Sequence, residues 1–187
     1  MWAAAVALPA ALWAADSATP REIDTQKSVM TVRVLKTGLF SAFAHDHEIS
    51  APIRDGKFSE TDPSVDLTAM RSRCGSWIRT CPRRTGLEIQ ENMLGPKVLD
   101  TGQFPEIRFR STAVEPAGEG RWAVSGDLML HGQTRPVKLA VRDQNGHYQG
   151  SAQLRQRDFG IEPISIGGGA VKVKDELRVE FDIVAKP

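Results

Sequence analysis

Alternation of apolar and polar side chains with a period of two is the feature that most constrains the fold of this chain. In residues 28–36, Met30, Val32 and Val34 fall on one side, while Thr31 and Arg33 fall on the other. Successive side chains of a β-strand point to opposite faces of a sheet, so this spacing is typical of a strand with one buried face. The pattern therefore predicts half-buried antiparallel strands.

The same pattern recurs along the chain and gives about eight strand-like runs. They are residues 28–36, 39–49, 64–70, 106–115, 121–130, 135–143, 147–157 and 170–185. Turn signals separate them, and Asn145-Gly146 is typical of a two-residue hairpin because both residues tolerate positive φ. One helical turn is expected over 87–94, ended by Gly95-Pro96. Hairpin-linked strands with one short helical excursion indicate an all-β, antiparallel barrel or sandwich.

The composition is that of an ordinary folded protein. Charged residues make up 25% of the 187 residues and apolar residues 41%, which is typical of one globular domain with a hydrophobic core. The 24 basic and 23 acidic side chains nearly cancel, and no block of like charge occurs. The sequence therefore shows no electrostatic footprint for nucleic acid.

The first fifteen residues, MWAAAVALPAALWAA, are apolar and uncharged. This run is too short to span a bilayer, and the polar DSATPRE follows it directly. It is typical of the hydrophobic region of a secretory signal peptide over residues 1–18, with a lipid-retained anchor and an N-terminal helix as alternatives. We therefore expect a periplasmic or secreted protein, with a barrel domain over residues 22–187 and no integral membrane segment after processing.

Residues 71–86, RSRCGSWIRTCPRRTG, follow neither the strand period nor a helical one. They contain both cysteines, Cys74 and Cys81, at a spacing that matches no zinc site. The segment is either an unusual basic loop or the product of a shifted reading frame, and resequencing the gene distinguishes the two. We assign no chemistry to either cysteine.

Four stretches resemble the YceI-like family. They are IDTQKSVMTVRV, GPKVLDTGQFPEIRFRSTAV, VSGDLMLHGQTRPVKLAV and RQRDFGIEPISIGGGAVKVKDELRVEFDIVA. The most specific pieces are FPEIRFRST (104–112) and LHGQTRPV (130–137). The resemblance covers residues 22–185 apart from the atypical segment 71–86.

The resemblance implies a lipocalin-like antiparallel barrel that is usually exported to the bacterial periplasm. Members are described as holding a long polyisoprenoid or similar amphiphile in an elongated apolar tunnel, and some are linked to stress responses. Many members carry a Val-x-Gly-x-Phe stretch on the second strand, where this chain has FSAFAHDHEI (40–49). The resemblance therefore does not fix the ligand of this chain.

His45 and His47 in that stretch are the residues that most suggest chemistry. On a strand they share one side with Phe43 and Ile49. They are read as half of a metal site, as polar contacts for a ligand headgroup, or as structural residues near the barrel rim. A metal site normally needs three or four ligands, and His131 is the obvious third candidate.

Three short motifs resemble catalytic or phosphate-binding signatures but lack their context. Asp158-Phe159-Gly160 spells a kinase motif without the glycine-rich loop or strand lysine of a kinase. Gly167–Gly169 is followed by a strand pattern instead of the helix that a phosphate loop requires. Ser41 lies near His45 in sequence without a nucleophile elbow. We therefore expect no enzymatic activity.

The inward faces of the strands provide the candidate ligand-binding residues. Such faces line either a ligand tunnel or a packed core, and composition alone does not separate the two. The resemblance favours a tunnel. The expected binding residues are Met30, Val32, Val34, Phe43, His45, His47, Ile107, Phe109, Leu128, Leu139, Val141, Leu154 and Phe181.

We therefore expect a binding protein that holds an amphipathic lipid, polyisoprenoid or quinone-like, in an apolar barrel interior. The lipid is the expected partner, no other cofactor is implied, and a homodimer is left open. One alternative is a metal-binding or redox protein that uses His45 and His47. Another is a structural or interaction barrel with a solid interior.

Overall fold

The computed structural model describes residues 19–37, 47–60, 63–70, 83–166 and 171–187. Within these ranges the chain is mostly antiparallel sheet, with one α-helix and one short 3-10 helix. The expected signal segment, Phe43, His45, Gly167–Gly169 and residues 71–82 of the atypical segment lie outside the described residues.

The strands follow one another along the chain with few interruptions. They are β1 (Arg21–Glu22), β2 (Val29–Thr37), β3 (His47–Ser50), β4 (Ile53–Ser59), β5 (Ser64–Met70), β6 (Glu106–Pro116), β7 (Arg121–Leu130), β8 (Gln133–Gln144), β9 (His147–Arg155), β10 (Ser165–Ile166) and β11 (Val171–Val184). The helices are α1 (Arg83–Leu94) and the 3-10 helix η2 (Gln156–Phe159). The order in the sheet is β1-β4-β5-β6-β7-β8-β9-β11-β2-β3, and β10 pairs with β11.

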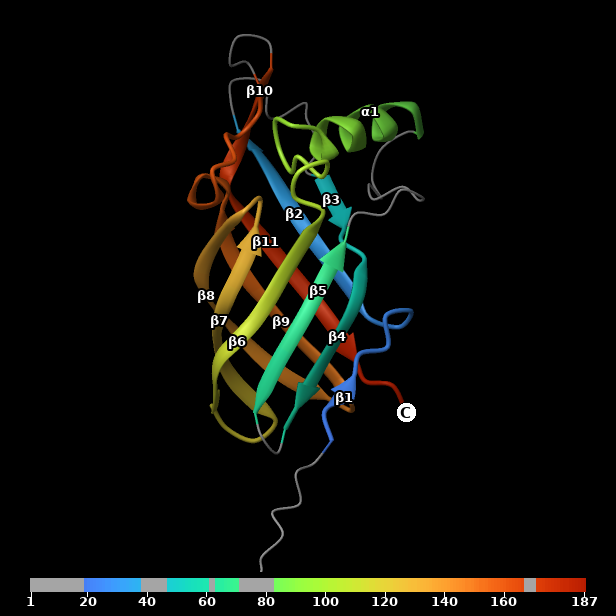
Figure 1. Ribbon diagram of the computed structural model, residues 1–187, viewed down its shortest axis with the longest axis vertical. Coiled ribbons are helices and arrows are strands. Elements are labelled where there is room, and N and C mark those ends of the chain that lie inside the picture. The colour runs from blue at the N-terminus through green and yellow to red at the C-terminus, as the bar shows by residue number, and fades with distance from the viewer. Residues whose placement is uncertain (1–18, 38–46, 61–62, 71–82, 167–170) are drawn as a thin grey trace, which may run out of the picture.

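The sheet curls until its two ends meet, which makes a barrel (Figure 1). β3 pairs with β2 and β4 pairs with β5, yet only Ala51 and Pro52 separate β3 from β4. This bent segment joins the two ends of the sheet. A bridge between Ile23 and Ala185 also ties the chain after β1 to the end of β11. The prediction of an antiparallel, lipocalin-like barrel of about eight strands is confirmed, because β3 and β4 together act as one wall strand.

The strand register explains why the sequence alternates. Met30 lies opposite Phe181 and Val32 lies opposite Val179, so apolar residues of β2 and β11 share the inner face. Residues between them, such as Arg33, share the outer face with polar partners. The predicted hairpin at Asn145-Gly146 is also confirmed, with φ of 57° and 83° at these two residues.

Several elements differ from the sequence expectation, among them the two-residue strands β1 and β10 and the 3-10 helix η2, which were not predicted. Strand β4 was not predicted, because a register shift between Ile53 and Asp55 breaks the alternation of its apolar residues. Helix α1 begins at Arg83, four residues before the expected helical turn, and so takes in the end of the atypical segment. It ends at Leu94, immediately before Gly95, as expected.

Fully buried apolar side chains concentrate in two clusters within the described chain. One cluster contains Ile23, Ile53, Phe58, Tyr148, Ile183 and Ala185, and we call it the packed end. The other contains Leu130, Phe159 and Ile161. Ile23 is 2% exposed and Phe159 is 1% exposed, so each is held tightly by its neighbours.

Candidate functional site

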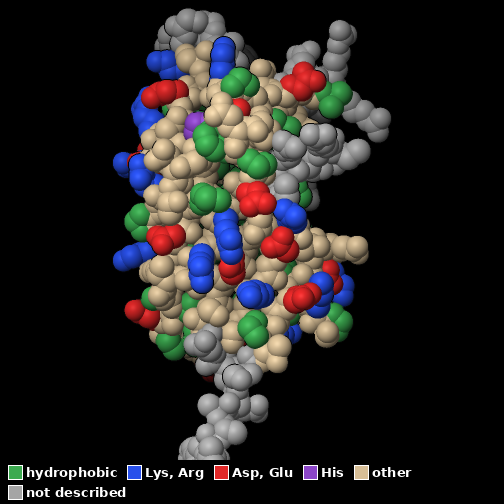
Figure 2. Space-filling model, in the orientation of Figure 1, with side chains coloured by type: hydrophobic (Ala, Val, Ile, Leu, Met, Phe, Trp, Pro, Cys, Tyr) green, Lys and Arg blue, Asp and Glu red, His purple; other side chains and the backbone are tan. Residues whose placement is uncertain are grey.

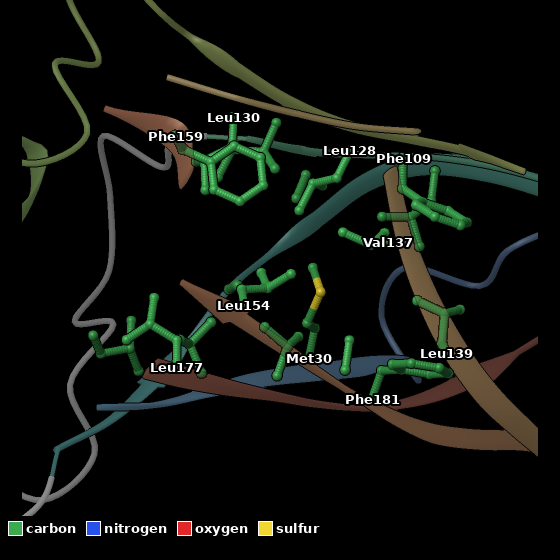
Figure 3. Close-up of a pocket in the computed structure, with 18 of the residues that line it drawn as sticks. Met30, Phe109, Leu128, Leu130, Val137, Leu139, Leu154, Phe159, Leu177 and Phe181 are labelled. Carbon is green, nitrogen blue, oxygen red and sulfur yellow. The ribbon is translucent and has the colours of Figure 1, made fainter. Parts of the chain in front are cut away.

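A cavity of about 1020 Å³ lies inside the barrel (Figure 3). This volume is at the upper limit of the roughly 300–1,000 Å³ that is usual for small-molecule sites. Side chains on the inner face of strands around the barrel line it. They include Met30 of β2, Phe109 of β6, Leu139 of β8 and Phe181 of β11. Hydrocarbon dominates the lining, and we call these half-buried inner residues the cavity wall.

The cavity is long. Along β11 its lining extends from Val173 to Ile183. Ten residue steps of about 3.3 Å, tilted by about 40° to the barrel axis, correspond to a length of roughly 25 Å. A space of this length suits an extended chain better than a compact ligand.

The extent to which inward-facing side chains are buried shows whether the barrel interior is hollow or packed. Val32, Leu139 and Val141 face inward, yet each remains only half-buried. In a filled core such side chains would be buried on all sides, because protein interiors pack like organic crystals. Their remaining accessible surface faces the cavity.

Ten of the thirteen expected binding residues line this cavity. They are Met30, Val32, Val34, Ile107, Phe109, Leu128, Leu139, Val141, Leu154 and Phe181. Phe43 and His45 lie outside the described residues, and for His47 the structure describes only the backbone, which pairs with Val34. The structure therefore brings the apolar set together around one space.

Several lining residues were not included in the expected set. Trp122, Val137, Leu177 and Val179 lie on the same alternating faces, so the period-two pattern could have found them. Phe159 could not be found in this way. It lies at the end of the 3-10 helix η2, where no strand period applies.

A polar contact lies at the packed end of the cavity. The Tyr148 hydroxyl donates a hydrogen bond to Oε1 of Glu60, and Nη1 of Arg21 lies 3.5 Å from the same oxygen. Burial, with this hydrogen bond and the negative charge of Glu60, raises the pKa of Tyr148 to about 12. The Tyr148 ring packs edge-on against Phe58 at a centroid distance of 4.7 Å. The phenol is thus held neutral and in place.

The opposite end of the cavity carries more polar groups, and we call it the mouth. Exposed Asn92, Lys97, Arg155, Glu162 and Ser165 all contribute to the lining there. They come from α1 and its following turn, the end of β9, the segment between η2 and β10, and β10 itself (Figure 1).

The charges of the mouth are not balanced. Glu162 pairs with Arg157 at 3.3 Å, whereas Lys97 and Arg155 form no ion pair with another described residue. The described mouth therefore presents two cationic groups to a ligand.

His131 has a structural role. Its Nδ1 lies 3.1 Å from the Phe159 carbonyl oxygen, which can only accept, so this nitrogen carries the proton. The ring packs edge-on against Phe104. No group of three or more His, Cys, Asp or Glu side chains suited to a metal occurs among the described residues. His131 is thus engaged elsewhere and does not complete a site with other described residues.

The side of the barrel seen in Figure 2 carries charged side chains of both signs. Arg33 on β2 contacts Glu48 and Glu180 on the two neighbouring strands at 2.9 Å and 2.8 Å. Arg108 holds Asp66 with two hydrogen bonds, which lowers the pKa of that carboxyl. None of the helices in the described ranges is long and apolar enough to cross a bilayer.

Comparisons with known proteins agree with this geometry. The sequence profile of the YceI-like domain matches residues 22–185. A UPF0312 protein of Pseudomonas savastanoi pv. phaseolicola is 30% identical over 145 residues, which is 70% of this chain and 73% of that protein. A UPF0312 protein of Vibrio cholerae is 35% identical over 103 residues, which is 50% of this chain and 53% of that protein.

A solved structure has the same fold. Burkholderia cenocepacia BcnA superimposes with a TM-score of 0.61 at 20% identity, covering 88% of this chain and 99% of BcnA. An identity this low shows the fold alone. The family profile spans nearly the whole described barrel, from Glu22 to Ala185. The chain therefore belongs to the YceI-like domain family.

Proposed function

We propose that this protein binds one amphipathic lipid, a polyisoprenoid or quinone-like molecule, and that it does so as an exported binding protein without catalysing a reaction. The single observation that carries the proposal is the long apolar cavity of about 1020 Å³. Membership of the YceI-like domain family and the BcnA-like fold support the same class of function.

The driving force would be removal of apolar surface from water. Burial is worth about 25 cal/mol per Å² of apolar surface before the entropic costs of binding are subtracted. Binding also adds van der Waals contacts to the cavity wall. An apolar cavity is poorly hydrated, and its side chains lack contacts on the open side. A hydrocarbon tail restores those contacts to Met30, Leu139 and their neighbours.

The polar ends of the cavity would orient the lipid. At the mouth, Asn92, Lys97 and Arg155 supply hydrogen-bond donors to a headgroup. At the packed end, the Tyr148 hydroxyl is already engaged with Glu60. A headgroup therefore finds its partners at the mouth, and the tail points toward the packed end.

Export is the second part of the proposal. It rests on the uncharged apolar run over the first fifteen residues, which is typical of a signal peptide. N-terminal sequencing of the mature protein from fractionated native cells tests it. The expected result is a chain that lacks the apolar run and is found outside the cytoplasm. An intact N-terminus in the cytoplasm would overturn this part.

The binding proposal is tested by organic extraction and mass spectrometry of protein purified from its native host. The expected result is about one isoprenoid or quinone-like molecule per chain. A Val179→Trp variant, which places an indole in the cavity, is the matched control and should release none. A folded wild-type protein that yields no lipid contradicts the proposal, and a stoichiometric metal would favour the metal-binding alternative.

A further inference from the structure

The packed end of the cavity carries polar side chains as well as apolar ones. Ser59, Glu60 and Tyr148 are the polar residues that line the cavity there, whereas the lining between this end and the mouth is hydrocarbon. Glu60 directly follows β4, and β1 and the end of β4 lie at the end of the barrel opposite α1 (Figure 1). The cavity therefore has polar groups at both of its ends.

Glu60 is the strongest hydrogen-bond acceptor at the packed end. Its Oε1 accepts the hydrogen bond of the Tyr148 hydroxyl and lies 3.5 Å from Nη1 of Arg21. An ionised carboxylate has about four acceptor positions on its two oxygens, so these contacts leave positions for another donor. The Glu60 side chain is also 47% exposed, which makes those positions accessible.

The neighbours of Glu60 hold its carboxylate in place. The guanidinium of Arg21 lies over the Phe58 ring, 5.7 Å from the ring centroid, and the Tyr148 ring packs edge-on against the same phenylalanine. Arg21 does not itself line the cavity. Burial and the Glu60 contact raise the pKa of Tyr148 to about 12, so the phenol keeps the proton that it donates. The carboxylate is thus a positioned acceptor.

A plain hydrocarbon tail would fit this end poorly. A tail long enough to reach the packed end covers part of Glu60 from water, and a methyl group offers no hydrogen bond in return. Covering a polar group without replacing its hydrogen bonds is unfavourable. A hydroxyl group at the tail end would instead donate to the carboxylate, and hydrogen bonds to a charged acceptor are the stronger kind.

We propose that Glu60 forms a second polar subsite, which binds a hydrogen-bond donor such as a hydroxyl group at the far end of the ligand's tail. The preferred ligand is then a chain with a polar group at each end, one at the mouth and one at Glu60. The inference rests on the proposed function and adds a chemical group to the tail. Binding of lipid by the apolar lining does not depend on it.

The test compares fatty acids with their ω-hydroxy derivatives at two chain lengths, using the lipid-free wild-type protein. ω-Hydroxyicosanoic acid should bind at least as tightly as icosanoic acid, because its hydroxyl group reaches Glu60. ω-Hydroxydodecanoic acid should bind about tenfold more weakly than dodecanoic acid, because its hydroxyl group ends in the hydrocarbon stretch without a partner. Affinities are measured by displacement of a fluorescent fatty acid.

Three variants assign the effect to one side chain. Glu60→Leu removes the acceptor, so ω-hydroxyicosanoic acid should bind about tenfold more weakly than icosanoic acid. Tyr148→Phe removes the phenol hydroxyl but leaves the carboxylate, and the wild-type preference should persist. Glu115→Leu is the matched control, because Glu115 is exposed and lies outside the cavity, next to the lining residue Val114. It should leave both affinities unchanged.

The outcomes separate the subsite from the proposed function. Weaker binding of ω-hydroxyicosanoic acid than of icosanoic acid by wild type rejects the subsite, and this comparison needs no variant to fold. A Glu60→Leu protein that weakens both acids equally would show a structural contact only. Loss of the preference in Tyr148→Phe would contradict the role of Glu60. Failure of wild type to bind any of the four acids would instead overturn the proposed function itself.

Discussion

The packed end and the cavity wall are built from the same strands and the same alternating pattern, yet their side chains are buried to different extents. On β11 both Ile183 and Val179 border the cavity, but Ile183 also belongs to the packed end and is buried, while Val179 is half-buried. In the sequence, both are apolar residues at alternating positions of the same strand, and the pattern does not distinguish them. The difference teaches that alternation decides which face of a strand is apolar, whereas the neighbours across the barrel decide whether that face is filled.

Truncation of one side chain in each region should give the largest contrast. Ile183→Ala removes contacts with a tightly packed cluster and should lower the free energy of unfolding by about 3–4 kcal/mol. Leu139→Ala, in the cavity wall, removes a side chain that already borders empty space and should cost about 1 kcal/mol. Urea unfolding of the lipid-free proteins measures both. Equal losses would show that the wall is packed as tightly as the end.

Enlargement should give the reverse contrast in function. Val179→Trp has room for the indole in the cavity, so stability should change by less than about 1 kcal/mol while lipid binding is lost. Ile183→Trp forces the same group into the packed end and should destabilise the protein by about 1–3 kcal/mol. Thermal unfolding and lipid titration of the two variants provide the data. A Val179→Trp protein that is as destabilised as Ile183→Trp would argue against a hollow barrel.

The phenol at the packed end gives a spectroscopic check, because Tyr148 is the only tyrosine of the chain. Its phenolate absorbance should appear with a pKa of about 12 in the folded protein, against an ordinary value of 10.0. The folded state holds this proton more tightly than the unfolded state. Stability should therefore fall as the pH rises from 10 toward 12. Titration at the ordinary value would show that the Glu60 contact does not form.

The ion pairs on the outer face of the barrel should contribute least to stability. Asp66 has a pKa below its ordinary value of 3.8, mainly because of its hydrogen bonds to Arg108. Its contribution to stability is complete above that ordinary value and is lost as the pH falls through the lower folded value. NMR titration of the Asp66 carboxyl should show the pKa rising back in Arg108→Gln, with only a slight loss of stability at neutral pH.

Arg110→Gln is the matched control for this ion pair. Arg110 lowers the pKa of Asp66 through its charge alone. The Arg110→Gln substitution should therefore raise the pKa of the Asp66 carboxyl less than Arg108→Gln does. A larger shift in the Arg110 variant would contradict the assignment of the hydrogen bonds.

Much of the wall could be predicted from the sequence because strands with one apolar face leave a period-two signal. Met30, Val32 and Val34 were placed correctly on the inner face by that signal alone. Where the strand is irregular the signal fails. A register shift hid β4, and Phe159 lies in a 3-10 helix, where its neighbours suggested only a spurious kinase motif.

The cavity itself could not be predicted in this way. Whether Leu139 and Phe181 meet or remain apart depends on the curvature of the barrel and on the glycines opposite the aromatic rings. Residues such as Gly150 read as weak points of a strand in the sequence, and only the three-dimensional register shows that a ring covers them. The resemblance to the YceI-like family supplied what the pattern could not.

The central claim is that the barrel interior is hollow, apolar and open to a lipid tail. Titration of a polarity-sensitive fluorescent fatty acid into the lipid-free protein tests this most directly. The account predicts saturable binding of about one probe per chain, emission typical of an apolar site, and displacement by geranylgeraniol. A correctly folded protein that shows no saturable binding would contradict it.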